Sequence, residues 1–225
     1  MLLSSLKAQT LIRARCQNEA AQAVTIAREK RKGGGLDPTR LAIIYLGNLL
    51  YDGFTLRECL AKIRDVDNAD LASETEDVFL RAKHVVESLQ GRPVERPFGT
   101  FSSPSNDFDV IAKPHASIEQ GSTLVHVIVL NSKTLDFTRD GAVIGAAIFD
   151  KALAPPLLHH QAYVFHDVWS GKQFRLEGVT AAERQLLIDF LLHLENLRRV
   201  TELRRIAGRK RQDAKATTSS VSQAS

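Results

Sequence analysis

The stretch YVFHDVWSGKQFRLEGVTAAERQLLIDFLL, residues 163–192, contains the change of pattern that decides the fold. Ala162–Trp169 and Gln173–Leu176 are rich in β-branched and aromatic residues and flank Ser170-Gly171, which predicts a hairpin. Thr180-Ala-Ala-Glu183 then has the spacing of a capping box, and apolar residues follow it at helical spacing. One short segment therefore predicts strand, turn, strand and helix, as in an α+β protein.

The segment before it also has strand patterns. Phe108–Ala112 is a short candidate strand, and Leu124–Leu130 (LVHVIVL) is almost continuously apolar, as expected of a strand buried on both faces. Asp140-Gly141 is a common hairpin turn, and it separates Thr134–Thr138 from Ala142–Phe149. We therefore expect an antiparallel β-sheet over about residues 108–177.

The first half of the chain has helix signals instead. Residues 5–32 are rich in alanine, contain no proline or glycine, and end at Gly33-Gly34-Gly35, which predicts one long helix. Three further helices are predicted by start and stop signals. They run from Asp37-Pro38 to Gly53, from the capping box Thr55–Glu58 onward, and from a second box, Ser73–Glu76, to Gly91.

These patterns divide the chain into four parts. We expect a helical region over 1–91 and a linker or loop over 92–107, where three prolines occur in GRPVERPFGTFSSPSND. The antiparallel sheet and a long C-terminal helix should occupy 108–208. The basic and Ser-rich tail, 209–225, lacks apolar periodicity and is predicted to be disordered.

Positive charge is concentrated at the two ends of the chain. Residues 1–40 hold 8 Lys and Arg against 3 Asp and Glu, a net charge of +5. Residues 198–225 hold 8 against 2, a net +6, whereas residues 41–197 hold 14 against 21, a net −7. Basic ends around an acidic body favour contact with nucleic acid, nucleoprotein or an anionic membrane surface. The same distribution permits a homo-oligomer in which the ends of one copy contact the body of another.

Two groups of basic residues are the candidate binding residues. The first comprises Arg28, Lys30, Arg31 and Lys32, and the second comprises Arg198, Arg199, Arg204, Arg205, Arg209, Lys210 and Arg211. Helical spacing places much of the second group along one side, which suits contact with phosphates. Alternatively, these arginines only complement the negative end of a helix dipole. Arg209-Lys210-Arg211 also resembles a short nuclear-import signal.

Motifs of common enzymes are absent from the sequence. Gly33-Gly34-Gly35 follows a helix and precedes no Gly-Lys-Ser/Thr, so we interpret it as a hinge or cap and not a phosphate loop. The only metal-like group is His159, His160, His166 and Asp167. Zinc needs three or four ligands, and neighbouring strand residues such as His166 and Asp167 point to opposite faces. We therefore expect no metal, no cofactor and no catalytic residue.

Three features bear on where the protein resides. Cys16 and Cys59 have no metal-ligand or disulfide-framework spacing, and free buried thiols are typical of a reducing compartment. Residues 1–18 lack acids and either begin a helix or form a mitochondrial transit peptide. The longest apolar run, Leu41–Tyr51, is about half the ~20 residues that a transmembrane helix needs. We expect a protein of the cytoplasm or nucleus, with mitochondria as the alternative.

The strand–turn–helix segment 163–192 and the basic composition resemble the closing segment of matrix proteins of negative-strand RNA viruses, the rhabdovirus type in particular. This resemblance implies a non-enzymatic structural protein of the virion that self-associates and engages nucleoprotein or membrane. The chain departs from the family because Pro155-Pro156 is followed by Leu157-Leu158, so no tyrosine completes a Pro-Pro-x-Tyr motif.

A second resemblance, over a shorter segment, is to 30K-type plant virus movement proteins. It rests on a β-rich centre with a hairpin aspartate, Asp136 or Asp140, and on the basic tail. It implies a nucleic-acid-binding transport protein. The leading hypothesis is thus a binding or structural protein, and the alternative from another class is an organellar enzyme or accessory factor.

Overall fold

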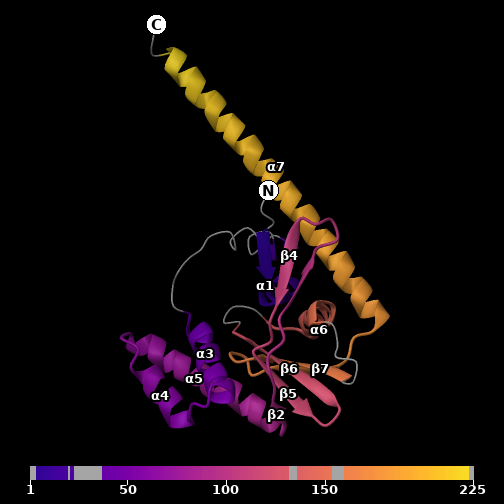
Figure 1. The fold of residues 1–225 in the computed structure, drawn as a ribbon. Helices are drawn as coiled ribbons and strands as arrows, with labels where there is room; N and C mark the ends of the chain where they lie inside the picture. The colour runs from indigo at the N-terminus through magenta and orange to yellow at the C-terminus, as the bar shows by residue number, and fades with distance from the viewer. Residues whose placement is uncertain (1–3, 20, 23–36, 132–135, 154–159, 223–225) are drawn as a thin grey trace.

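The computed structural model describes residues 4–19, 21–22, 37–131, 136–153 and 160–222, with side chains from 5 to 202 in these ranges. The helices are α1 (Ala8–Arg15), α3 (Pro38–Tyr51), α4 (Leu56–Arg64), α5 (Ala69–Ser88), α6 (Arg139–Leu153) and α7 (Ala181–Ser222). The strands are β1 (Ser4–Lys7), β2 (Arg92–Pro93), β3 (Gly99–Ser102), β4 (Phe108–Ala112), β5 (Ala116–Gln120), β6 (Thr123–Leu130), β7 (His160–Asp167) and β8 (Gln173–Glu177). The predicted α+β class is confirmed (Figure 1).

The larger sheet has the strand order β2-β5-β6-β7-β8 and is buried on both faces at its centre. Val125, Val127 and Val129 of β6 point toward α3, α4 and α5, where they join one apolar core. Ile128 and Leu130 point to the other face and join a second core with α1, α6 and α7. The continuous apolar pattern of LVHVIVL therefore has the predicted cause, because alternate residues enter two different cores.

In the first half of the chain, each of α3, α4 and α5 begins directly after a residue whose side chain caps it. Asp37 caps α3 by accepting a hydrogen bond from the Thr39 N–H at 2.9 Å, and Thr55 and Glu58 form the predicted capping box of α4. The box predicted at Ser73–Glu76 is wrong, because α5 begins at Ala69. Its N-cap is Asn68, which accepts from the Leu71 N–H at 2.9 Å.

Helix α6 occupies the segment in which the sequence predicts a hairpin, so that prediction is wrong. Gly141 lies in the first turn of α6 and donates its N–H to Thr138 Oγ1 at 3.3 Å. A Cβ at Gly145, one turn later, would lie 2.6 Å from the Phe165 ring and 3.0 Å from Ile12. Close packing of α6 against β7 and α1 therefore explains the glycines, and no turn is involved.

This correction changes the sheet. Because α6 is a crossover between β6 and β7, these two strands pair in parallel, from Thr123–His160 to Leu130–Asp167. The predicted antiparallel sheet is thus a mixed sheet, in which β2-β5, β5-β6 and β7-β8 are the antiparallel pairs. The predicted hairpin at Ser170-Gly171 is confirmed as the turn between β7 and β8, with Gly171 at φ +72°.

A second, three-stranded sheet has the order β1-β4-β3 and corrects two further predictions. Ser4–Lys7 is a strand parallel to β4 and not the first turns of a long helix; α1 ends at Arg15, and a turn follows before helical Glu19. Leu6 is buried in this sheet, so tertiary burial decides the local conformation. The segment 92–107, expected as a linker or loop, contains β2 and β3.

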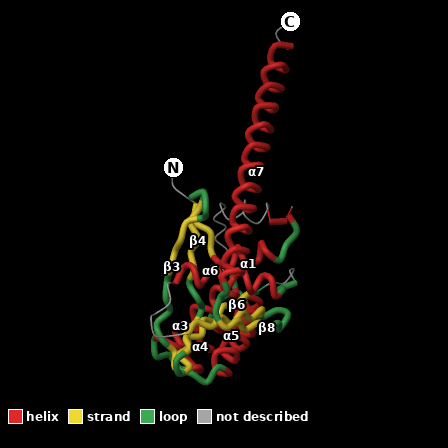
Figure 2. The backbone as a smooth tube through the Cα atoms, turned by 90° about the vertical axis from the view of Figure 1, so that its right-hand side faces the viewer, coloured by secondary structure: helices red, strands yellow, loops and turns green. Residues whose placement is uncertain are grey.

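Helix α7 begins after the predicted Thr180 capping box, in which Thr180 and Glu183 exchange hydrogen bonds of 2.8 to 3.2 Å. Its backbone continues past Gly208, the expected end, to Ser222, so residues 209–222 are helical where the sequence predicts disorder. No proline interrupts this segment, and its alanines, lysines and arginines favour helix. The far part of α7 extends away from both sheets (Figures 1 and 2).

Candidate functional site

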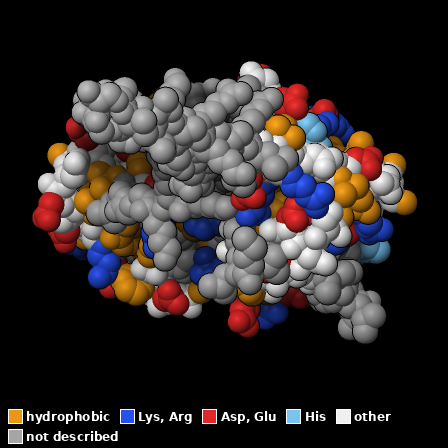
Figure 3. All heavy atoms as spheres, turned by 90° about the horizontal axis from the view of Figure 1, so that it is seen from above, with side chains coloured by type: hydrophobic (Ala, Val, Ile, Leu, Met, Phe, Trp, Pro, Cys, Tyr) orange, Lys and Arg blue, Asp and Glu red, His pale blue; other side chains and the backbone are white. Residues whose placement is uncertain are grey.

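Figure 3 shows the molecule from the side to which α7 extends. Basic and acidic side chains alternate over the described part of this surface, and several Lys and Arg side chains lie in a recess beside it. In the ranges that the structure describes, no helix is both long and apolar enough to cross a membrane.

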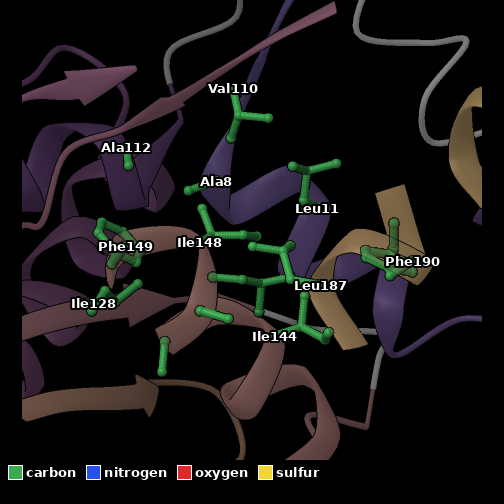
Figure 4. Close-up of a cluster of buried hydrophobic side chains, with 14 of the residues drawn as sticks. Ala8, Leu11, Val110, Ala112, Ile128, Ile144, Ile148, Phe149, Leu187 and Phe190 are labelled. Carbon is green, nitrogen blue, oxygen red and sulfur yellow. The ribbon is translucent and has the colours of Figure 1, made fainter. Parts of the chain in front are cut away.

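The first part of α7, residues 181–202, is anchored to the body; we call it the root. Leu187, Phe190, Leu191 and Leu194 are buried in the core that α1 and α6 share (Figure 4). Glu195 is also buried, and its Oε1 accepts a hydrogen bond from the Ser105 N–H at 2.9 Å. The root is thus fixed by apolar packing and by a polar contact to the turn between β3 and β4.

Arg198 and Arg199, two of the predicted binding residues, contact the same turn. Arg198 Nη1 donates to the Asp107 carbonyl at 2.9 Å, and Arg199 Nε donates to the Asp107 carboxylate at 3.1 Å. The Arg198 side chain is only 17% exposed and also lies 3.9 Å from Glu202. These two arginines therefore fix α7 to the body and have little positive charge to spare for a partner.

Of the other predicted binding residues, some lie where only the backbone is described and some lie outside the described residues. Arg204, Arg205, Arg209, Lys210 and Arg211 follow the root on the same helix, in a segment whose backbone alone is described. We call residues 203–222 the arm; they hold 6 Lys and Arg against 1 Asp, a net charge of +5. Arg28, Lys30, Arg31 and Lys32 lie outside the described residues.

The histidines do not assemble into a group. His159 lies outside the described residues, His160 is exposed at the start of β7, and His166 and Asp167 are buried at its end. Asp167 stabilises the following turn, because its Oδ2 accepts from the Ser170 hydroxyl at 2.6 Å. Burial lowers the pKa of His166. A search of the described residues finds no set of three His, Cys, Asp or Glu side chains that could hold a metal ion.

A different polar group, which the sequence does not predict, lies between α1, α3 and the end of β6. We call it the cationic cluster; it consists of Gln9, Arg13, Thr39, Arg96, His115 and Asn131. Arg13 Nη2 donates to the Asn131 carbonyl at 3.1 Å, and Asn131 Nδ2 donates to Thr39 Oγ1 at 2.7 Å. Arg13 Nε and Asn131 Oδ1 are buried, and neither has a hydrogen-bond partner among the described residues.

His115 lies at the centre of the cationic cluster. Its Nδ1 accepts a hydrogen bond from the Val129 N–H at 2.8 Å, so the proton of the neutral ring is on Nε2. Gln9, one helical turn before Arg13, places its amide nitrogen 3.4 Å from that Nε2. Burial, with the nearby positive charges of Arg96 and Arg13, lowers the pKa of His115 to about 4. The ring is therefore neutral at pH 7, and its Nε2–H is shared with the side-chain amide of Gln9.

Arg96 completes the cationic cluster from the segment between β2 and β3. Its guanidinium carbon lies 5.0 Å from the centre of the Tyr51 ring, in a cation–π contact. On α3, a Cβ at Gly47 would lie 3.3 Å from Arg96 Nη2, so the absent side chain leaves space for the guanidinium. Tyr51 is itself fixed, because its hydroxyl accepts from the Ser117 N–H at 3.1 Å. These contacts hold Arg96 in one orientation.

The sequence signals for this cluster are weak for a physical reason. Arg13, Arg96 and His115 are far apart in the chain and have no shared motif. Only the pairing of β1 with β4 and the packing of α1 on α6 bring α1 to the end of β6. Those two features depend on the strand and the helix that the sequence patterns miss, so the cluster could not have been predicted without them.

Comparisons with known proteins add little. No protein-family model matches the chain, and no curated protein matches it in sequence. Among solved structures it is similar to the one described as "Crystal structure of SSO0001", with a TM-score of 0.43 and 7% identity. That similarity covers 88% of this chain and 78% of the other. A TM-score this low supports no conclusion about function, so the function is argued from the residues alone.

Proposed function

We propose that this protein is a non-enzymatic binding protein whose arm engages the phosphate backbone of nucleic acid. The observation that carries the proposal is the division of α7. Its root is fixed by buried apolar residues and by Glu195, Arg198 and Arg199, whereas the arm leaves the body and carries a net charge of +5. A helix that is fixed at one end and basic at the other can lie along a polyanion without disturbing the core.

The apolar residues of the arm do not explain it as a helix that packs on a core. Among the α7 residues whose side chains are described, the last that packs on the core is Leu197, and the arm beyond Ile206 is rich in Arg, Lys, Ala, Ser and Thr. A helix stabilised by burial needs an apolar stripe, which the arm lacks. Its function therefore rests on charge, and a matrix-like role with self-association is a finer version of the same proposal.

The test neutralises the arm in the full chain. Changing Arg204, Arg205, Arg209, Lys210 and Arg211 together to glutamine keeps helix propensity and removes five charges. The wild-type protein should bind duplex DNA with a log–log salt slope of roughly −4, as four or five phosphate contacts would give. The variant should bind at least about a hundredfold more weakly at low salt. Fluorescence anisotropy with a labelled duplex measures both.

A matched control removes five exposed charges from the body. Arg40, Arg57, Lys62, Arg139 and Lys151 are exposed and can be changed to glutamine in the same way. If this control loses as much affinity as the arm variant, binding follows net charge alone and the arm has no special role. Wild-type affinity that does not change with salt would contradict the proposal. Stronger binding to anionic vesicles than to DNA would assign the arm to a membrane surface instead.

A further inference from the structure

The cationic cluster has more hydrogen-bond donors than acceptors, and no described carboxylate forms an ion pair with its two arginines. Among the described ion pairs, none includes Arg13 or Arg96. Both guanidiniums lie close enough to His115 that their positive charges, after burial, help to lower its pKa. Water solvates half-buried cations only in part, so an anion bound beside them would be stabilised by charge-assisted hydrogen bonds.

Donor groups of the cluster remain for a ligand. The side-chain amide of Gln9 is hydrogen-bonded to His115 Nε2 at 3.4 Å, and an N–H of that amide remains to donate to a ligand. Arg13 has a buried Nε–H that no described protein atom accepts. The one unpaired acceptor, Asn131 Oδ1, can take the hydroxyl hydrogen of a hydrogenphosphate or a ribose. A tetrahedral oxyanion is the ligand that suits this set of groups.

The cluster is organised before a ligand arrives. Arg96 is held over Tyr51 and against Gly47, while Arg13 is held by the Asn131 carbonyl and His115 by the Val129 N–H. All three cationic or donor side chains are half-buried, so they remain reachable from solvent but are partly sheltered from it. Fixed donors in such a position bind an anion more strongly than mobile surface lysines do, because little order is lost on binding.

We infer that the cationic cluster is a binding site for one phosphate group, carried by inorganic phosphate, a nucleotide or the backbone of a nucleic acid. Arg13 and Arg96 supply the charge, Gln9 supplies a neutral donor beside His115, and Asn131 accepts from a hydroxyl of the ligand. This site is separate from the arm. It does not depend on the arm's proposed function, and either one can fail without the other.

The experiment measures phosphate binding by the full-length protein and by a double variant, Arg13→Gln with Arg96→Gln. Calorimetry or nuclear magnetic resonance at constant ionic strength would use two probes, inorganic phosphate and a dinucleotide with one phosphodiester. Wild-type protein should bind at least one probe at a single site, and the double variant should bind it at least about tenfold more weakly. If only inorganic phosphate binds, the ligand is free phosphate; if only the dinucleotide binds, the phosphate group belongs to a nucleotide or nucleic acid.

Two further proteins separate a binding site from a general effect. Arg57→Gln with Arg139→Gln removes two exposed positive charges elsewhere, and it should bind the probe as the wild type does. Gly47→Ala keeps every charge but places a methyl group against Arg96, so it should weaken binding several-fold while the helix stays intact. Because this variant retains Arg13 and Arg96, it remains informative if the double variant does not fold.

One spectroscopic result would be specific to the proposed geometry. An anion beside His115 favours the charged ring, so saturating phosphate should raise the pKa of His115 from its value of about 4. The ring resonances of His115 should report this, whereas those of exposed His160 should move much less. If neither probe binds, or if binding is the same in the wild type, the double variant and Gly47→Ala, the inference is wrong.

Discussion

The cationic cluster and the arm hold positive charge in opposite ways. In the cluster, two arginines and a neutral histidine from separate segments are half-buried and fixed by neighbouring groups. In the arm, six basic residues follow one another along a single helix that leaves the body. The first arrangement suits one small anion at a defined distance. The second suits a long polyanion through many exchangeable contacts that salt weakens.

We expect the largest difference between the cationic cluster and the arm in how the free energy of unfolding depends on pH. Burial lowers the pKa of both His115 and His126 from 6.5 to about 4, and His126 is fully buried beside Tyr163. Between these pH values the unfolded chain binds protons that the folded chain does not, so stability falls as pH falls from 6.5 to 4. Each histidine should contribute up to about 3 kcal/mol to this loss. Urea denaturation at several pH values measures it.

Variants locate the effect. His115→Gln and His126→Gln should each flatten the dependence of the free energy of unfolding on pH in this window, whatever they do to stability at pH 7. The arm variant with five glutamine substitutions should keep the wild-type dependence of stability on pH, because the arm lies outside the core. A wild-type protein whose stability is constant from pH 6.5 to 4 would show that these rings are more hydrated than the structure indicates.

The same two regions show what sequence patterns can predict. The charge of the arm is a run of residues in one helix, and Arg204, Arg205, Arg209, Lys210 and Arg211 are visible in the sequence as candidates. Caps at Asp37, Thr55 and Thr180 are likewise local, since each side chain bonds to backbone two or three residues away. Local interactions of this kind leave a direct trace in the order of residues.

The cluster depends on contacts that are not local. Asp140-Gly141 is a hairpin signal in isolation, and only the closeness of α1 and Phe165 explains why glycines occur at 141 and 145 within a helix. Ser4–Lys7 is a strand because β4 offers it a partner about 100 residues away. Once α6 and β1 are misassigned, the parallel pairing of β6 with β7 and the position of α1 are missed as well. The cationic cluster lies where these elements meet.

The root of α7 fixes the arm to the body, and Glu195 is the residue whose replacement should weaken this attachment. Its side chain is 1% exposed and accepts the Ser105 N–H, so Glu195→Ala would leave that donor unpaired and create a cavity. We expect a loss of about 2 kcal/mol in the free energy of unfolding. Asn196→Ala, at the next and exposed position, should change it by less than about 0.5 kcal/mol. Equal losses would show that the contact to Ser105 adds nothing.

The smallest expected effect concerns Arg199, which the sequence places among the binding residues. Its guanidinium pairs with Asp107 at 3.1 Å, and the two side chains are 54% and 27% exposed. A pair this exposed contributes at most about 0.5 kcal/mol, so Arg199→Gln should change stability by no more than that. Its charge is already balanced by Asp107. DNA affinity should therefore change by less than about twofold, since no phosphate contact is lost.

Arg204→Gln, five positions further along α7, provides the matched measurement. Arg204 lies in the arm, so removing it should weaken DNA binding by about two- to fivefold at low salt and reduce the salt slope by about 1. Both variants lose one positive charge from the same helix, and only their position relative to the body differs. If Arg199→Gln weakens binding as much as Arg204→Gln does, the phosphate-binding surface extends onto the root. The Asp107 pair would then open when nucleic acid binds, and the boundary between root and arm would lie before residue 199.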